Sequence, residues 1–269
     1  MKKIALITLI LLFSLTLVFA QGAKEAQGDN SLQKVLESGK FVLGLDDSFP
    51  PMGYRDENNE IVGFDIDLAR EVTSRMGVEL VLQPIDWNAK EQELNTGNID
   101  CIWNGFTITD ERKENMNFTE AYVNNAQVAV VKDESQIKTL NDLKGKSVGL
   151  QAGSSAAEAI NSNEAFAASL KEVVEVKDNL TALMDLEIGG VDAVVLDLFV
   201  ANDNIKRSGK AFRILDEPLS SEKYGIGFRK NDSALRNEVQ KTLEAMAKDG
   251  KMAEISTDWF DGDITIIGK

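Results

Sequence analysis

The stretch that decides the fold is GFDIDLAREVTSRMGVELVLQPIDWNAKEQELNTGNIDCIW, residues 63–103. Its apolar residues recur at every fourth position from Phe64 to Met76, which predicts an amphipathic helix that Gly77 ends. A strand, a second helix and a further strand are then predicted in turn, at 78–85, 90–97 and 99–103. Because strands alternate with helices, the segment is expected to form a parallel sheet with helices on its faces.

The same alternation returns in the second half of the chain. Strands are predicted at 147–151, 173–176 and 191–197, and helices at 155–166 and 180–190. Two extended segments, 126–132 and 217–228, could cross between the two units. We therefore predict an α/β protein of two lobes, each a mainly parallel sheet flanked by helices, with two hinge crossings. Small ligands commonly bind in the cleft between such lobes.

The start of the chain predicts export. Two lysines precede an apolar run from Ile4 to Ala20 that ends in Val-Phe-Ala, the pattern of a signal peptide cut after Ala20. The alternative is an uncleaved anchor, but the run is shorter than the roughly 20 apolar residues that a span needs. The only cysteine, Cys101, lies far from the cut, so we expect a periplasmic or extracytoplasmic protein without a lipid anchor.

The expected organisation follows from these segments. Residues 1–20 are the signal peptide, and 21–30 are a small, polar, flexible leader. The first lobe comprises 31–127 together with 221–269, and the second lobe comprises 128–220.

Composition excludes several classes of function. The chain has no histidine and one cysteine, so histidine-dependent catalytic triads, imidazole zinc sites and an intrachain disulfide are impossible. Its formal net charge of −15 disfavours nucleic acid as a partner. We expect no cofactor, no metal and no catalytic residue, and we expect a monomer.

Five segments together resemble a known family. They are GFDIDLA (63–69), NIDCIWNGFTITDERKENMNFTEAY (98–122), LKGKSVGLQAGSSAAE (143–158), GGVDAVVLD (189–197) and YGIGFRKND (224–232). In this order they resemble the bacterial extracellular solute-binding proteins, family 3, which include histidine-, glutamine- and lysine/arginine/ornithine-binding proteins. The resemblance implies the two-lobed periplasmic-binding-protein fold (type II). It also implies a non-enzymatic protein that closes on a free, polar or basic L-amino acid and delivers it to the membrane permease of an ABC importer.

The resemblance assigns the ligand's carboxylate to Arg112, at the end of the Thr107-Ile-Thr-Asp-Glu-Arg112 element. A guanidinium can bind a carboxylate through two parallel hydrogen bonds, which a lysine cannot do. Family likeness adds backbone N–H donors at Thr107 and at Ser155, where Ser154-Ser155 opens a predicted helix. The alternative is that Arg112 is a surface residue paired with a neighbouring acid of its own helix.

The ligand's ammonium needs an acceptor, and the family places an acid at the position of Asp197. This residue ends a predicted strand, and ligands of doubly wound folds bind at the carboxyl ends of strands. The alternative is that Asp197 caps the helix that follows. The Gly105 carbonyl is a plausible second acceptor.

Five further positions are expected to surround the ligand's side chain, and the resemblance places three of them there, Asp46, Phe49 and Trp87. Phe49 and Trp87 would sandwich it, although both could equally be core residues. Asp46 would reach a polar or basic end, or else cap its own loop. Asn104 and Gln151 would add hydrogen bonds and thereby influence specificity.

A rival function uses the same scaffold, namely a periplasmic dehydratase-like enzyme. A fold does not exclude such an activity. Against it, no second group positioned for proton transfer is recognisable in the sequence beside a carboxylate such as Asp46.

Overall fold

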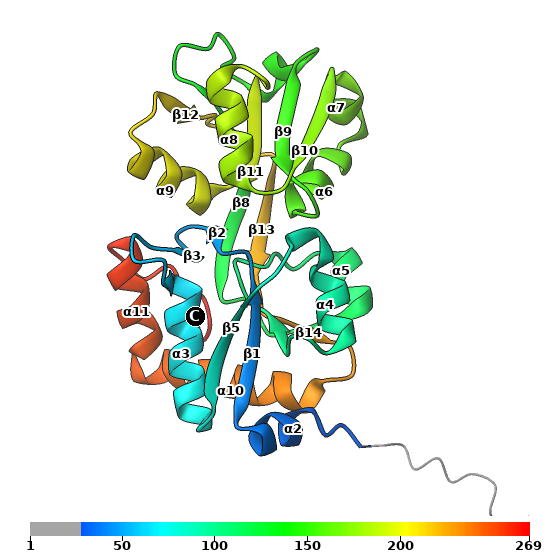
Figure 1. Cartoon of the computed structure of the whole chain (residues 1–269). Coiled ribbons are helices and arrows are strands. Elements are labelled where there is room, and N and C mark those ends of the chain that lie inside the picture. Colours follow the sequence, from blue (N-terminus) through cyan, green and yellow to red (C-terminus); the bar gives the residue numbers. More distant parts are fainter. Residues whose placement is uncertain (1–27) are drawn as a thin grey trace, which may run out of the picture.

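The computed structural model describes residues 28–269, so the predicted signal peptide and most of the predicted leader lie outside the described residues. Two helix-covered sheets lie at opposite ends of an elongated molecule, and two long strands run from one to the other (Figure 1). The two-lobed α/β architecture predicted from the sequence is confirmed.

The sheet of the first lobe has the strand order β5-β1-β6-β14-β7. Strand β1 (Lys40–Leu45) pairs in parallel with β5 (Glu79–Pro84) and with β6 (Cys101–Ile102). Strand β14 (Gly227–Arg229) pairs antiparallel with β6 and β7 (Met116–Phe118). The helical elements of this lobe are α2 (Ser31–Ser38), α3 (Phe64–Met76), η1 (Trp87–Ala89), α4 (Lys90–Thr96), α5 (Asp110–Asn115), α10 (Ser233–Asp249) and α11 (Lys251–Phe260).

The sheet of the second lobe has the order β10-β9-β11-β8-β12, and β13 also pairs with β8. Its parallel part consists of β9 (Ser147–Gln151), β10 (Glu172–Val176) and β11 (Ala193–Asp197). Its antiparallel part consists of β8 (Val123–Lys132), β12 (Phe212–Ile214) and β13 (Ser220–Tyr224). The helical elements are η2 (Leu140–Leu143), α6 (Ser155–Asn161), α7 (Glu164–Ser169), α8 (Asn179–Ile188) and α9 (Leu198–Ser208).

Both main sheets are therefore mixed rather than mainly parallel. The parallel strands are those that the strand–helix rhythm predicts, and the antiparallel strands come mostly from short segments without a crossover helix. The helix predicted at 155–166 is two helices, because the Asn163 side chain accepts the Phe166 N–H at 3.0 Å and starts α7 anew. The segment between β1 and α3 contains a small sheet of β2 (Ser48–Phe49), β3 (Gly53–Arg55) and β4 (Ile61–Val62).

The two crossings are hydrogen-bonded to each other. Strands β8 and β13 pair antiparallel from Val123 opposite Tyr224 to Gln127 opposite Ser220. The predicted crossing segment 217–228 contains β13, and the predicted segment 126–132 lies within β8. Both strands connect the two sheets in Figure 1. The exact lobe boundaries, 127/128 and 220/221, stay a prediction.

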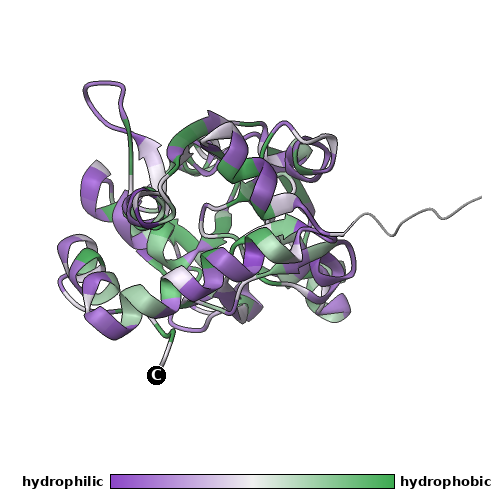
Figure 2. Ribbon diagram, turned by 90° about the horizontal axis from the view of Figure 1, so that it is seen from below, coloured by the Kyte–Doolittle hydropathy of each residue, from purple (hydrophilic) through white to green (hydrophobic). Residues whose placement is uncertain are grey.

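The largest apolar cluster contains buried residues of both lobes, and each lobe adds a smaller cluster of its own. In the first lobe, Phe64, Leu68 and Val72 of α3 are fully buried, as the four-residue periodicity predicts. The outer loops and helical turns are mostly hydrophilic, with hydrophobic segments gathered inside (Figure 2). Within residues 28–269, no helix combines the length and apolar character needed to cross a bilayer.

The start of α3 is fixed against the turn that follows β2. The backbone N–H groups of Phe64 and Asp65 donate to the carbonyls of Pro51 and Met52, at 2.9 and 3.1 Å. Gly63 precedes them with φ 149°, in the region that glycine favours, and a methyl group added there would overlap the Met52 carbonyl. This close approach determines where α3 and the Phe49 turn lie relative to each other.

Replacing Gly63 by alanine should therefore lower the free energy of unfolding by about 1–3 kcal/mol, because the backbone must strain or the turn must move. Urea unfolding followed by circular dichroism measures this loss. Gly190→Ala is the matched control, since its added methyl would meet the Asp185 carbonyl at an ordinary 3.4 Å and its φ lies outside the left-handed region. Equal losses in the two variants would contradict this explanation.

Candidate functional site

Arg112 is held inside the molecule at the start of α5. The Thr109 hydroxyl caps this helix by accepting the Arg112 N–H at 3.2 Å. The guanidinium donates from Nη1 to the Thr107 carbonyl at 2.8 Å and from Nη2 to the Gly153 carbonyl of the second lobe at 3.3 Å. It lies 4.4 Å from the centroid of the Phe106 ring, and the residue is only 8% exposed. The guanidinium therefore sits between the lobes.

The alternative that Arg112 is a surface residue paired with a neighbouring acid is wrong. Asp110 pairs instead with Lys113, at 2.9 Å. Among residues 28–269 no carboxylate lies within ion-pair distance of the Arg112 guanidinium. Burial lowers the pKa of Arg112, yet a guanidinium keeps its proton in proteins. A buried cation without a counter-ion is unfavourable, so an anionic ligand would be stabilised beside it.

Thr107 and Ser155 meet across the lobe boundary. The Ser155 hydroxyl donates to the Thr107 hydroxyl at 3.1 Å, and Thr107 in turn donates to Glu222 at 2.9 Å. Gln127 of β8 donates to the Ser155 hydroxyl at 3.2 Å. Ser154 precedes α6 as its N-cap residue, and its buried hydroxyl has no hydrogen-bond partner in the described part of the chain. The residues predicted to bind the ligand's carboxylate therefore come from both lobes and lie close together.

Asp197 lies at the carboxyl end of β11 and is 4% exposed. It occupies the N-cap position of α9 but makes no capping hydrogen bond, so the capping alternative is wrong. Its Oδ1 instead accepts from the Asn125 amide at 2.7 Å and from the Tyr224 hydroxyl at 2.6 Å. Burial, followed by the charge of Glu222, raises the pKa of Asp197 to about 8. An ammonium group bound nearby would favour the ionised carboxylate.

Sequence reasoning missed four residues that organise this region, all on the paired crossing strands. They are Asn125 and Gln127 of β8 and Glu222 and Tyr224 of β13. The Asn125 amide also donates to Glu222 at 2.6 Å, so Asp197 and Glu222 share one donor. The available signal was the spacing of Asn125 and Gln127, two amide side chains two residues apart in an extended segment, because alternate residues of a strand face the same side. Among residues 28–269, no group of three acidic or cysteine side chains could hold a metal ion.

Asp46 connects the lobes at another point of the interface. Its Oδ1 accepts from both the backbone N–H and the hydroxyl of Ser48, at 2.9 Å each, which is the loop-capping role left open from the sequence. Its Oδ2 accepts from the Gln151 amide of the second lobe at 2.6 Å. The Asn104 side-chain oxygen accepts the Asp46 N–H at 3.1 Å. Burial raises the pKa of the Asp46 carboxyl. Asp46 thus contacts both of the other polar residues expected around a ligand side chain, Asn104 and Gln151.

The two aromatic candidates are buried. Trp87 packs edge-on to Phe106, with ring centroids 5.6 Å apart, and belongs to an apolar cluster of the first lobe. Phe49 lies against Gly105, since a methyl group at position 105 would come within 2.9 Å of the Phe49 ring. The core alternative accounts for these contacts. Whether the rings also flank a ligand stays a prediction.

Asp65, which sequence reasoning also missed, fixes the Gly105 segment. This fully buried carboxylate accepts the Gly105 N–H at 2.6 Å and the Tyr122 hydroxyl at 2.8 Å. Burial raises its pKa to about 7. Because Asp65 accepts the Gly105 N–H, the Gly105 backbone is held in place against Phe49.

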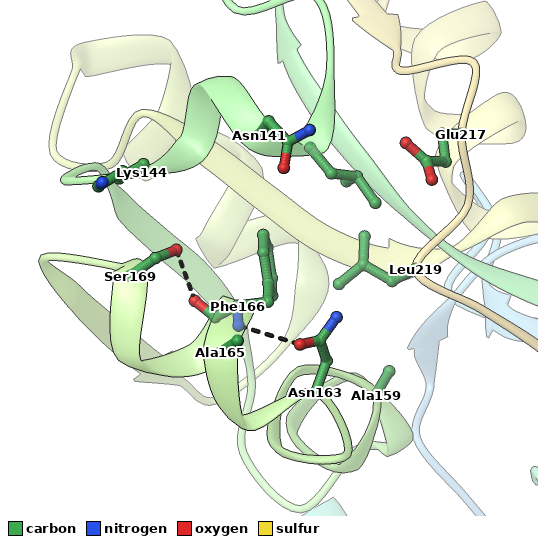
Figure 3. Close-up of a pocket in the computed structure, with 10 residues that line it drawn as sticks. Asn141, Lys144, Ala159, Asn163, Ala165, Phe166, Ser169, Glu217 and Leu219 are labelled. Atoms are coloured by element: carbon green, nitrogen blue, oxygen red, sulfur yellow. Dashed lines mark hydrogen bonds between the residues drawn. The ribbon is translucent and has the colours of Figure 1, made fainter.

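One cavity lies apart from the candidate site, and two others lie at it. A cavity of about 390 Å³ lies within the second lobe and is lined by residues such as Leu140, Phe166 and Leu219 (Figure 3). None of the predicted site residues lines it. By contrast, Arg112 and Ser154 line a cavity of about 580 Å³ between the lobes. Thr107 and Ser155 line a second interlobe cavity of about 250 Å³.

Comparisons with known proteins identify relatives of this chain. The chain is 31% identical over 254 residues to the L-cystine-binding protein TcyJ of Escherichia coli, with 94% of each chain covered. It is 30% identical over 260 residues to the arginine-binding extracellular protein ArtP of Bacillus subtilis, covering 95% of this chain and 98% of that protein. The crystal structure of an ABC uptake transporter substrate-binding protein from Streptococcus pneumoniae with bound histidine matches with a TM-score of 0.86 and 36% identity, covering 89% of this chain and 99% of that chain.

The model of one family matches most of the chain, from residue 41 to residue 262. Its extent includes every residue of the candidate site. With a buried cation and a buried acid at the interface of two lobes, and with relatives similar over almost their whole length, the chain belongs to the bacterial extracellular solute-binding proteins, family 3.

Proposed function

We propose that this protein captures a free L-amino acid with a polar or basic side chain by closing its two lobes, and delivers it to the permease of an ABC importer. The observation that carries the proposal is that a guanidinium and a carboxyl group are both buried at the lobe interface. Within residues 28–269 Arg112 has no carboxylate partner, and Asp197 is held by neutral donors. A zwitterion supplies the missing charge to each of them.

The proposed binding mode follows from the present contacts. A ligand carboxylate would take the guanidinium hydrogen bonds that Arg112 now makes to two backbone carbonyls. Thr107 and Ser155 would add donors from the two lobes, with Ser154 beside them. The ligand's ammonium would bind Asp197, with the Gly105 carbonyl as a second acceptor. Because these groups come from both lobes, the ligand would stabilise the closed arrangement.

The choice of ligand class rests on the polar cluster around Asp46. Its carboxylate oxygen now binds the Gln151 amide, and the Asn104 side-chain nitrogen is buried without a hydrogen-bond partner among residues 28–269. A ligand with a donor at its far end could replace the Gln151 amide on Asp46. Phe49 and Trp87 would pack against its stem. The three relatives named above are described as binding cystine, arginine and histidine, all of which carry nitrogen or sulfur beyond the α-carbon.

We further propose that residues 1–20 are removed on export and that the mature protein acts as a monomer outside the cytoplasm. The family consists of extracellular proteins, which supports this location. The proposed lobes are 31–127 with 221–269, and 128–220. These boundaries fall within the paired strands β8 and β13.

Thermal shift with each standard amino acid and with cystine should identify ligands that raise the melting temperature, because binding to the folded state stabilises it. Arg112→Ala should then weaken binding of every ligand found by about 100-fold or more in titration calorimetry, since a charge-assisted pair is lost. Lys113→Ala is the matched control, because its side chain pairs with Asp110 on the surface of the same helix. A shift with no amino acid would contradict the proposed function, whereas an unchanged affinity of Arg112→Ala would contradict the site.

Asp46→Asn should change which amino acid is preferred rather than abolish binding. The amide keeps an oxygen for the Ser48 contacts but removes the charge that a basic side chain would meet. Affinity ratios between basic and neutral amino acids, measured for both proteins, test this expectation. Equal proportional losses for all ligands would show that Asp46 acts only as a loop cap.

A further inference from the structure

Lys90 is a buried cation that the proposed binding mode does not use. It is the first residue of α4 and is 4% exposed. Its ammonium donates to the Trp87 carbonyl at 3.2 Å and lies 5.4 Å from the centroid of the Trp87 ring. A lysine this buried is normally paired with an acid. Among residues 28–269, however, no carboxylate lies within ion-pair distance of Lys90.

Its shortest hydrogen bond crosses to the other lobe. Lys90 Nζ donates to the Gly153 carbonyl at 2.8 Å, from the turn that connects β9 to α6. Gly153 has φ +70°, and a Cβ there would lie 3.2 Å from Lys90 Nζ and 3.1 Å from the Asn88 side-chain oxygen. The position thus requires glycine both for its conformation and for the closeness of the two lobes.

The Gly153 carbonyl accepts from two cations at once, since Arg112 Nη2 also donates to it, at 3.3 Å. In the proposed binding mode the ligand's carboxylate takes over Arg112. Lys90 would then be the group that still holds the Gly153 carbonyl. The next residues along the chain are Ser154 and Ser155, which are expected to contact the ligand, so the position of this carbonyl determines where they lie.

We propose that Lys90 is a positioning residue that fastens the Gly153 turn of the second lobe over the carboxylate end of the cleft when the lobes close. The inference rests on the proposed function and adds a residue to it. In the closed arrangement the Lys90 ammonium and the Arg112 guanidinium repel each other across the shared carbonyl, but the hydrogen bond from Lys90 to Gly153 outweighs this repulsion. Burial, followed by the charge of Arg112, lowers the pKa of Lys90 to about 8. A bound carboxylate would offset this repulsion and leave the hydrogen bond to Gly153 intact.

The test variant removes the ammonium donor of Lys90 and keeps its aliphatic chain. Lys90→Met preserves the apolar chain against Trp87 but cannot donate to Gly153. With the amino acid that the wild-type screen identifies, stopped-flow fluorescence should show about 10-fold faster dissociation with little change in the association rate, because the contact forms only on closure. Lys113→Met, which changes an exposed lysine, should dissociate at the wild-type rate.

A second variant approaches the same contact from the other lobe. Gly153→Ala leaves Lys90 in place but pushes the turn away from it, so it should show the same faster dissociation. Spin-label distances between the lobes should lengthen in both variants, with or without ligand. Wild-type dissociation rates and lobe distances in both variants would overturn the role of Lys90.

The outcomes for Lys90 and for the proposed function are separable. If the wild-type protein binds no amino acid, the proposed function fails, while the lobe distances without ligand still test the Lys90 contact. If the wild-type protein binds and both variants behave like it, the amino-acid proposal stands and the inference about Lys90 is wrong.

Discussion

Burial of an unpaired charge between two lobes is the constraint on which the rest of the structure depends. The Arg112 guanidinium is buried without a carboxylate partner in the described part of the chain, and it is hydrogen-bonded to the carbonyls of Thr107 and Gly153. Backbone carbonyls offset only part of the lost hydration of a guanidinium. The ring of Phe106 covers one face and fixes its direction. Such an arrangement is stable in the fold yet remains receptive to an anion, which is what a reversible carboxylate site requires.

The paired strands β8 and β13 position the carboxyl group of Asp197. Because β8 and β13 pair residue by residue, Asn125 lies opposite Glu222 and Val123 opposite Tyr224. Two of the donors that hold Asp197 come from these strands. The ammonium side of the proposed site is therefore built on the segment that connects the lobes, and the carboxylate side lies where Lys90 and Gly153 meet. The affinity for a ligand that contacts both sides would therefore depend on the angle between the lobes.

Much of the fold could be predicted from the sequence, because local periodicity determined it. The four-residue repeat of α3 and the apolar runs of β9 and β11 appear where they are expected. The small sheet of β2 to β4 and the antiparallel strands could not be predicted in this way. Their strands are short, and their pairing depends on register with distant segments. The break between α6 and α7 depended on a single cap, Asn163.

Some residues of the candidate site could likewise be predicted from the sequence, and others could not. Arg112, Thr107, Ser155 and Asp197 carry recognisable motifs, and the structure places them at the lobe interface. Lys90, Asp65 and Glu222 act through partners more than 35 residues away, so no local pattern marks them.

The central claim is that Arg112 and Asp197 bind the two opposite charges of one zwitterion. A crystal structure with the amino acid found by screening tests it most directly. The account predicts a bidentate contact from Arg112 to the α-carboxylate and an α-ammonium within 3 Å or so of Asp197. A bound ligand with Arg112 still on the Gly153 carbonyl, or with no charged nitrogen at Asp197, would contradict it.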